Sequence, residues 1–448
     1  MNIRAYLLIG LLLTQGYAWS KDSQPINLTL DKALEIALDK NQGVRIARLE
    51  VKKSQAQLIE ARSYLFPKLS ASGQYLRNIE KPVIFLPPGT PFGVGGKPTI
   101  MEIGSDNSYV GTISASLPLF SNAIYSGIRL SKRGVELAEE AYHGSRVNII
   151  AEVKKAFYGV LLAGEVRDLT QMSFKNAEEN LENVRQLHQQ GLVAEYDLIR
   201  AEVQVENLKP VVLQVENNFE LAKNKLRITI GLEASQEIEI EGKLTYENPI
   251  EVPSFDKALE EVMTNNPDLR QLDIQIKMAH EAITLEKSSH YPSLAAFGNY
   301  QYQTQSNDFK FPDYTWVKTM FVGLQLQVPI FNGFGIMARV NQAKLGLSQA
   351  EERRKAFTEA IKTQLESVIY RIEQAKKRIE GRTKTIAQAE LGYEIARTRY
   401  TNGLGTQLEV NDADLALMQA RVNYVQAVYD YKVALTDYEQ LMDGSTSR

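Results

Sequence analysis

The stretch SLPLFSN at residues 116–122 has a counterpart in the second half of the chain, QVPIFNG at residues 327–333. Each places a proline near the end of an alternating apolar segment, followed by an aromatic residue and a turn-forming residue. Proline lacks an N–H group and fixes its own φ, so it marks places where regular structure changes. We therefore expect the hydrophobic period to change at Pro118 and at Pro329.

On the N-terminal side of these prolines the period is two. In the second copy, Met320, Val322, Leu324 and Leu326 alternate with Phe321, Gly323 and Gln325. Four such strands are expected, at about 68–78, 108–118, 293–304 and 318–328. Their length of about 10 residues is that of a tilted membrane strand, and an apolar face opposite a Ser/Thr/Gln face is typical of a transmembrane barrel. A soluble antiparallel sheet with one buried face is the alternative interpretation.

On the C-terminal side the period changes to alternating steps of three and four, the seam of a coiled coil. Long helices are expected at about 121–230 and 332–442, each range folding back on itself at a glycine-bearing turn. The helical pattern of residues 332–401 alone would extend on the order of 100 Å. Pro67 and Pro292 mark the opposite junctions, where a helix gives way to a strand.

The chain contains two copies of one architecture. LDKALEIALDKN at residues 30–41 recurs as FDKALEEVMTNN at 255–266, and GLVAEYD at 191–197 recurs as GLGTQLE at 403–409. Such self-similarity predicts two structural repeats, 21–245 and 246–448, each containing a helix, two strands and a pair of long helices. Residues 1–20, with Arg4 ahead of an apolar run, are interpreted as a secretory signal peptide.

Composition argues against several functional classes. The chain has no cysteine, so it forms no disulfide, thiolate metal site or lipidated cysteine. Its 51 basic and 54 acidic residues give no charge bias toward nucleic acid. His143, His188, His280 and His290 are scattered without metal-ligand spacing. We therefore expect no enzyme, no cofactor and no metal site.

Four strands cannot close a membrane barrel, because barrels of this kind have about eight strands or more. An open sheet edge in lipid leaves backbone groups unpaired, at several kcal/mol each. The barrel must therefore be assembled from several chains. Periodicity alone leaves two copies and three copies open.

The repeat, the SLPLF and QVPIF junctions and the two turns at Gly191 and Gly403 together resemble the TolC family of outer-membrane efflux channels, over residues 28–443. The resemblance implies a mainly α fold that assembles as a homotrimer: a 12-stranded β-barrel in the outer membrane of a Gram-negative cell, continued by a periplasmic 12-helix α-barrel. It implies the exit duct of a tripartite efflux or type I secretion system. The partners would be a periplasmic adaptor protein, an inner-membrane transporter and outer-membrane lipid.

The resemblance also implies roles for the two turns. Carboxylates at Glu409 and Asp412 would form the narrowest ring of a periplasmic gate, and Asp197 would be linked to Tyr400 across the closed tip. A second link would need an arginine where this chain has Gly405. The adaptor would dock at six tip residues: Gly191, Leu192, Val193, Gly403, Leu404 and Gly405.

A plainer interpretation also accounts for the turns. Glycine ends one helix, and carboxylates begin the next because the helix dipole favours anions there by about 0.3–1 kcal/mol. Two other classes of protein stay open at this point. One is an exported coiled-coil scaffold with a soluble sheet; the other is a passive porin, which has no use for helices on the order of 100 Å long. No motif selects a drug, a metal ion or a protein as the exported substrate.

Overall fold

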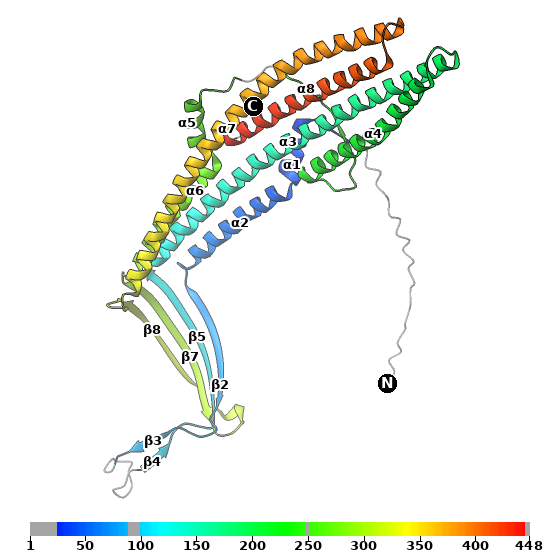
Figure 1. Ribbon diagram of the computed structural model, residues 1–448. Helices are drawn as coiled ribbons and strands as arrows, with labels where there is room; N and C mark the ends of the chain where they lie inside the picture. The colour runs from blue at the N-terminus through cyan, green and yellow to red at the C-terminus, as the bar shows by residue number, and fades with distance from the viewer. Residues whose placement is uncertain (1–24, 88–98, 248–250, 444–448) are drawn as a thin grey trace, which may run out of the picture. The chain divides into compact units, whose positions relative to one another are not determined.

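The computed structural model describes residues 25–87, 99–247 and 251–443 (Figure 1). The expected signal peptide lies outside the described residues, as does most of the Pro/Gly-rich loop at 85–99. The chain divides into two compact units. The strand unit comprises Gln42–Asn148, Ile250–Arg371 and Asp437–Arg448; the tip unit comprises Met1–Asn41, Ile149–Pro249 and Ile372–Thr436. Each unit contains residues from both repeats, so the two compact units do not coincide with the two sequence repeats.

The strand unit contains a four-stranded antiparallel sheet, drawn side by side in Figure 1. Its order is β2 (Lys68–Arg77), β5 (Asn107–Phe120), β7 (Ser293–Ser306) and β8 (Val317–Gln327). The strands that end the sheet are β2 and β8, and each has a strand partner on one side only within the described sheet. The four strands match the four alternating segments of the sequence closely.

The register separates the side chains into two faces, because directly opposed residues lie on the same side of a sheet. Leu324 opposes Ala296, and Gln325 opposes Ala295. One face carries Leu69, Ala71, Ile113, Ala115, Leu117, Ala296, Val322, Leu324 and Leu326; the other carries Ser70, Ser72, Gln74, Thr112, Ser114, Asn299, Gln301 and Gln325. On the apolar face Val322 is 77% exposed and Leu324 is 68% exposed. Exposure of such an apolar face to water would be unfavourable.

The polar face has one aromatic pair, Phe297 and Phe321, with ring centroids 6.2 Å apart. Phe297 opposes Gly323, and a Cβ atom at position 323 would lie 2.9 Å from its ring. Glycine therefore makes room for the ring of Phe297. The polar face of β7 can therefore hold this one large apolar side chain.

The prolines stand near the expected junctions, with one difference. Pro67 directly precedes β2, Pro292 directly precedes β7, and Pro329 lies between β8 and α7 (Gly335–Thr401). Pro118 instead lies inside β5, which continues to Phe120 after a register shift. The irregularity in the ladder accommodates a residue that cannot donate a backbone hydrogen bond.

The strand unit also holds α2 (Gln42–Ser63), α5 (Phe255–Asn265), α6 (Pro267–Ser288) and the sheet-proximal parts of α3 (Asn122–Gln189) and α7. Asn266 caps α6: its side chain accepts hydrogen bonds from the N–H groups of Asp268 and Leu269. Its Nδ2 donates to the carbonyl of Leu441, 3.3 Å away, at the end of α8 (Gln407–Leu441). One buried side chain thus starts one helix and holds the end of another.

Several short elements were not expected from the sequence. A separate hairpin, β3 (Val83–Leu86) with β4 (Thr99–Glu102), flanks the Pro/Gly-rich loop, and a 3₁₀ turn, η1 (Phe311–Asp313), stands between β7 and β8. In the tip unit, β1 (Ile26–Leu28) pairs in parallel with β6 (Ile238–Ile240). Segments of three or four residues are too short to show a period.

The tip unit is built from α1 (Leu30–Lys40), α4 (Glu195–Thr229) and the tip-proximal parts of α3, α7 and α8. Gly231, at φ +79°, follows α4, and a Cβ there would lie 2.7 Å from the carbonyl oxygen of Lys40. Nearby, Asn41 donates to the carbonyl of Thr229 at 2.8 Å. Only glycine allows the ends of α1 and α4 to approach this closely.

The long helices bury apolar seams. The expected seam of α7 is buried over six successive positions, Ile361, Leu365, Val368, Ile372, Ala375 and Ile379. Among the described residues, no helix has an apolar stretch of the length that a bilayer span requires.

Candidate functional site: the helix tips

The first tip joins α3 to α4 through a turn centred on Gly191. The N–H of Leu192 donates to the carbonyl of Leu187, and the N–H of Gly191 donates to the carbonyl of His188, both at 2.9 Å. Gly191 has φ +73°. These two crossed bonds and a left-handed glycine define a Schellman motif, which satisfies carbonyls that the helix end would leave unpaired.

The second tip repeats this geometry between α7 and α8. Leu404 donates to the carbonyl of Arg399 at 2.8 Å, and Gly403, at φ +69°, donates to the carbonyl of Tyr400 at 3.0 Å. Thr406 then caps α8 by accepting a hydrogen bond from the N–H of Glu409, 3.3 Å away. The two repeats therefore end their long helices in the same way.

Each tip exposes a leucine directly after its glycine. Leu192 is 67% exposed and Leu404 is 72% exposed. Val193 is half-buried, and its carbonyl oxygen lies 3.2 Å from Nδ1 of His188. Each of the two ordered turns thus exposes an apolar side chain to solvent.

Position 405 is crowded. A Cβ on Gly405 would lie 3.1 Å from Oε2 of Glu409 and 3.2 Å from Cβ of Arg399. Arg399 fills the adjoining space: its Nη2 donates to the carbonyl of Leu404 at 3.1 Å, and its Nη1 lies 4.0 Å from Glu409. An arginine of the preceding helix therefore occupies the turn in which the resemblance would place one at position 405.

The two carboxylates of the expected gate lie on one face of α8, because residues three apart in a helix are neighbours. Both Glu409 and Asp412 are exposed. The pair between Arg399 and Glu409 is solvent-exposed on both sides, so it adds little stability. The geometry leaves both carboxylates available to cations.

Asp197 and Tyr400 come from different tips and are close enough to interact. Tyr400 is half-buried; burial, and after it the negative charge of Asp197, raise the pKa of its phenol. The phenol therefore stays protonated at neutral pH and can act as a hydrogen-bond donor. Asp197 also lies in the first turn of α4 with Glu195, where the helix dipole favours either carboxylate.

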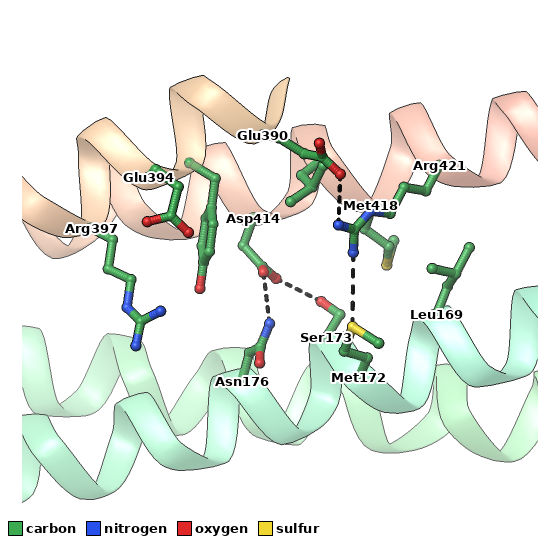
Figure 2. A pocket seen from close by; sticks show the side chains of 12 residues that line it. Leu169, Met172, Ser173, Asn176, Glu390, Glu394, Arg397, Asp414, Met418 and Arg421 are labelled. Atoms are coloured by element: carbon green, nitrogen blue, oxygen red, sulfur yellow. Dashed lines mark hydrogen bonds and ion pairs between the residues drawn. The ribbon is translucent and has the colours of Figure 1, made fainter. Parts of the chain in front are cut away.

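A polar cluster behind the tips was missed in the sequence. Asp414 on α8 accepts hydrogen bonds from Ser173 and Asn176 on α3 (Figure 2). Closer to the tips, Asn411 lies 3.5 Å from Asn180. A pattern of apolar residues does not reveal such a cluster. The available signal was the spacing of Ser173, Asn176 and Asn180, which places three polar side chains along one face of α3.

The cluster borders a groove of about 410 Å³ between α3, α7 and α8. Both signs of charge line it, with Glu390, Glu394 and Asp414 against Arg397 and Arg421. In the part of the chain that the structure describes, no group of three His, Cys, Asp or Glu side chains is arranged to hold a metal ion.

Solved outer-membrane channels share this fold. The Campylobacter jejuni CmeC outer membrane channel superimposes with a TM-score of 0.74 at 19% identity, covering 99% of this chain and 94% of that one. The open-state Neisseria gonorrhoeae MtrE outer membrane channel gives 0.71 at 20% identity, covering 92% and 88%. The sheet and the long paired helices are thus the architecture of an outer-membrane channel.

The sequence places the chain in a family. The model of the outer membrane efflux protein family matches residues 33–232 and 258–443, so the chain belongs to that family. This confirms the resemblance to TolC channels, and the family is one of channels rather than enzymes.

Curated relatives agree with this assignment. Outer membrane protein TolC of Vibrio cholerae is 22% identical, over 73% of this chain and 75% of its own length. The toluene efflux pump outer membrane protein TtgC of Pseudomonas putida is 21% identical over 88% and 78%. Alkaline protease secretion protein AprF of Pseudomonas aeruginosa is 20% identical over 73% and 68%.

Proposed function

We propose that the chain forms the outer-membrane exit channel of an efflux or secretion system and that three copies build it. The observation that carries the proposal is the four-stranded sheet, which has one exposed apolar face, one polar face and two unpaired edges among the described strands. Lipid contact would cover the apolar face, and water in a pore would solvate the polar face.

Edge pairing between copies would close the sheet into a barrel. In lipid each unpaired backbone group costs several kcal/mol, so β2 of one copy pairs with β8 of the next. Two copies would give eight strands and three copies 12, and the 12-stranded barrel of three copies is the assembly expected for the family. The helices continue this barrel into the periplasm, since α3 has 68 residues and α7 has 67, each on the order of 100 Å.

Relatives named for toluene efflux and for alkaline protease secretion support an export role for the channel. The proposed partners are a periplasmic adaptor and an inner-membrane transporter. The adaptor would dock at the six tip residues, where Leu192 and Leu404 expose apolar surface on rigid turns. A periplasmic scaffold is disfavoured because it would leave Val322 and Leu324 in water.

The tips would form the gate of the channel. Three copies bring Glu409 and Asp412 around one axis as a ring of six carboxylates, which attracts cations. Asp197 and Tyr400 join the α3–α4 hairpin to the α7–α8 hairpin within each copy and favour the closed state. These roles rest on the family resemblance and on the placement of the four side chains within the tip unit.

We expect Asp197→Ala to raise the open fraction of single channels in planar bilayers several-fold, because it removes the charged neighbour of Tyr400. Glu195→Ala is the matched control, since Glu195 is a carboxylate in the same first turn of α4. Equal effects of the two variants would show that only helix-start charge matters. A wild-type protein that forms no conducting pores would contradict the channel function itself.

A further inference from the structure

We propose that Asp414 is a positioning residue of the gate, which holds the α7–α8 hairpin against α3 and so fixes where Glu409 and Asp412 stand. This inference rests on the proposed function and deepens it. Asp414 belongs to neither of the site groups expected from the sequence, the carboxylate ring and the link between Asp197 and Tyr400.

The contacts of Asp414 run from one hairpin to the other. Its Oδ2 accepts a hydrogen bond from Oγ of Ser173 at 2.8 Å, and its Oδ1 accepts one from Nδ2 of Asn176 at 3.0 Å. Figure 2 shows the carboxylate of Asp414 directed from α8 toward these two donors on α3. Ser173 is 7% exposed, so the bond from its hydroxyl is largely shielded from water. Both oxygens of one carboxylate are thus committed to α3.

The neighbouring charges are paired mainly within the α7–α8 hairpin. Nη2 of Arg421 donates to Glu390 of α7 at 2.9 Å, while its Nη1 has only a weak acceptor on α3, the sulfur of Met172 at 3.8 Å. Asp414 and Tyr393 of α7 line the same groove. Burial and, after it, the negative charge of Asp414 raise the pKa of the Tyr393 phenol. Asp414 therefore makes the strongest of these contacts between the hairpins.

The character of the two facing helices changes along their length. Near the tips, the contact uses Ser173, Asn176 and Asn180 on α3 with Asn411 and Asp414 on α8. Farther from the tips, both helices bury apolar side chains: Val153, Phe157 and Val160 on α3, and Ala427, Val428 and Tyr431 on α8. Phe157 lies close to Gly242, and the ring of Tyr431 packs edge-on against that of Tyr246. Since the helices run antiparallel, these apolar sets lie at corresponding levels.

This change sets which part of the helices can separate. Separating an apolar contact loses the whole free energy gained by burying its surface. Polar groups, in contrast, regain hydrogen bonds to water when they separate. The tip-proximal stretch can therefore open while the apolar stretch stays packed. Asp414 lies within the separable stretch, on the same helix as Asp412 and Glu409, so its release moves the gate carboxylates.

The direct test is a reversible lock. The chain has no cysteine of its own, so Ser173→Cys with Asp414→Cys introduces one defined pair. Single channels of the oxidised protein should stay closed, and a reducing agent should raise their open fraction above that of the wild type. The single variants Ser173→Cys and Asp414→Cys are the controls, because each breaks the contact but cannot form the crosslink, so oxidation should leave the open fraction of each unchanged. If oxidation and reduction of the Ser173→Cys, Asp414→Cys variant left its open fraction unchanged, the proposal would be overturned.

Removal of the contact tests the same inference without a crosslink. Asp414→Ala, and separately the double change Ser173→Ala with Asn176→Ala, should each raise the open fraction by about tenfold, the factor expected for hydrogen bonds to a charged group. Combining all three changes should add little more, because either side already breaks the contact. Glu394→Gln removes a carboxylate from the same groove and should leave gating unchanged.

The outcomes separate this inference from the proposed function. Failure of the wild type to conduct would remove the channel function and the positioning role together. Normal wild-type gating with Asp414→Ala and Glu394→Gln behaving alike would overturn the role of Asp414 and leave the channel function standing.

Discussion

Leu324→Arg should abolish the assembled barrel in the outer membrane, while Gln325→Arg should leave most of it intact. Leu324 is 68% exposed on the apolar face of β8, opposite Ala296, and Gln325 lies on the polar face, opposite Ala295. An arginine near the bilayer midplane costs about 2 to 4 kcal/mol. The cost recurs in every copy of the assembly.

The neighbouring positions make this a controlled comparison, since strand, depth and introduced charge are nearly the same. The quantity to measure is the yield of heat-modifiable, protease-resistant oligomer in outer-membrane fractions. Val322→Arg should behave like Leu324→Arg, because both side chains belong to the apolar face. Equal yields from Leu324→Arg and Gln325→Arg would contradict the assignment of the two faces.

The double change Glu409→Ala with Asp412→Ala should abolish the cation selectivity of the channel in planar bilayers and raise its conductance. In the proposed trimer, six carboxylates would meet at the narrowest point, where they would attract cations and where divalent or trivalent cations would bridge them. The variant should also lose block by such cations.

Asp268→Ala is a suitable control, because Asp268 is a first-turn carboxylate of α6 in the strand unit, away from the tips in sequence. It tests whether loss of any helix-start carboxylate changes permeation. Wild-type selectivity and block in the double alanine variant would mean that Glu409 and Asp412 serve only to begin α8.

The hydrophobic period and the positions of the tip glycines predicted most of the fold. The alternation of apolar and polar residues placed all four strands and both faces, since a one-residue slip would move every side chain to the wrong face. Steps of three and four placed the α7 seam from Ile361 to Ile379, which is buried throughout. The two tip glycines could be assigned to turns because a Schellman motif needs a residue at positive φ.

Features that depend on tertiary contact could not be found this way. The extension of β5 past Pro118 depends on its pairing with β7, where a register shift admits the proline. Strands β1 and β6 are distant in the sequence and only three residues each. The proposed role of Asp414 depends on Ser173 and Asn176, which face it from another helix. The residue pattern of a single helix does not reveal such a contact.

The closure of the β2 and β8 edges between copies is the centre of the account, and native mass spectrometry of the protein released from mild detergent tests it most directly. Twelve strands require three chains, so the account predicts a trimer as the main species. Leu324→Arg should reduce that trimer, whereas Asp414→Ala should preserve it. A stable monomer or dimer of the wild-type chain under the same conditions would contradict the 12-stranded barrel.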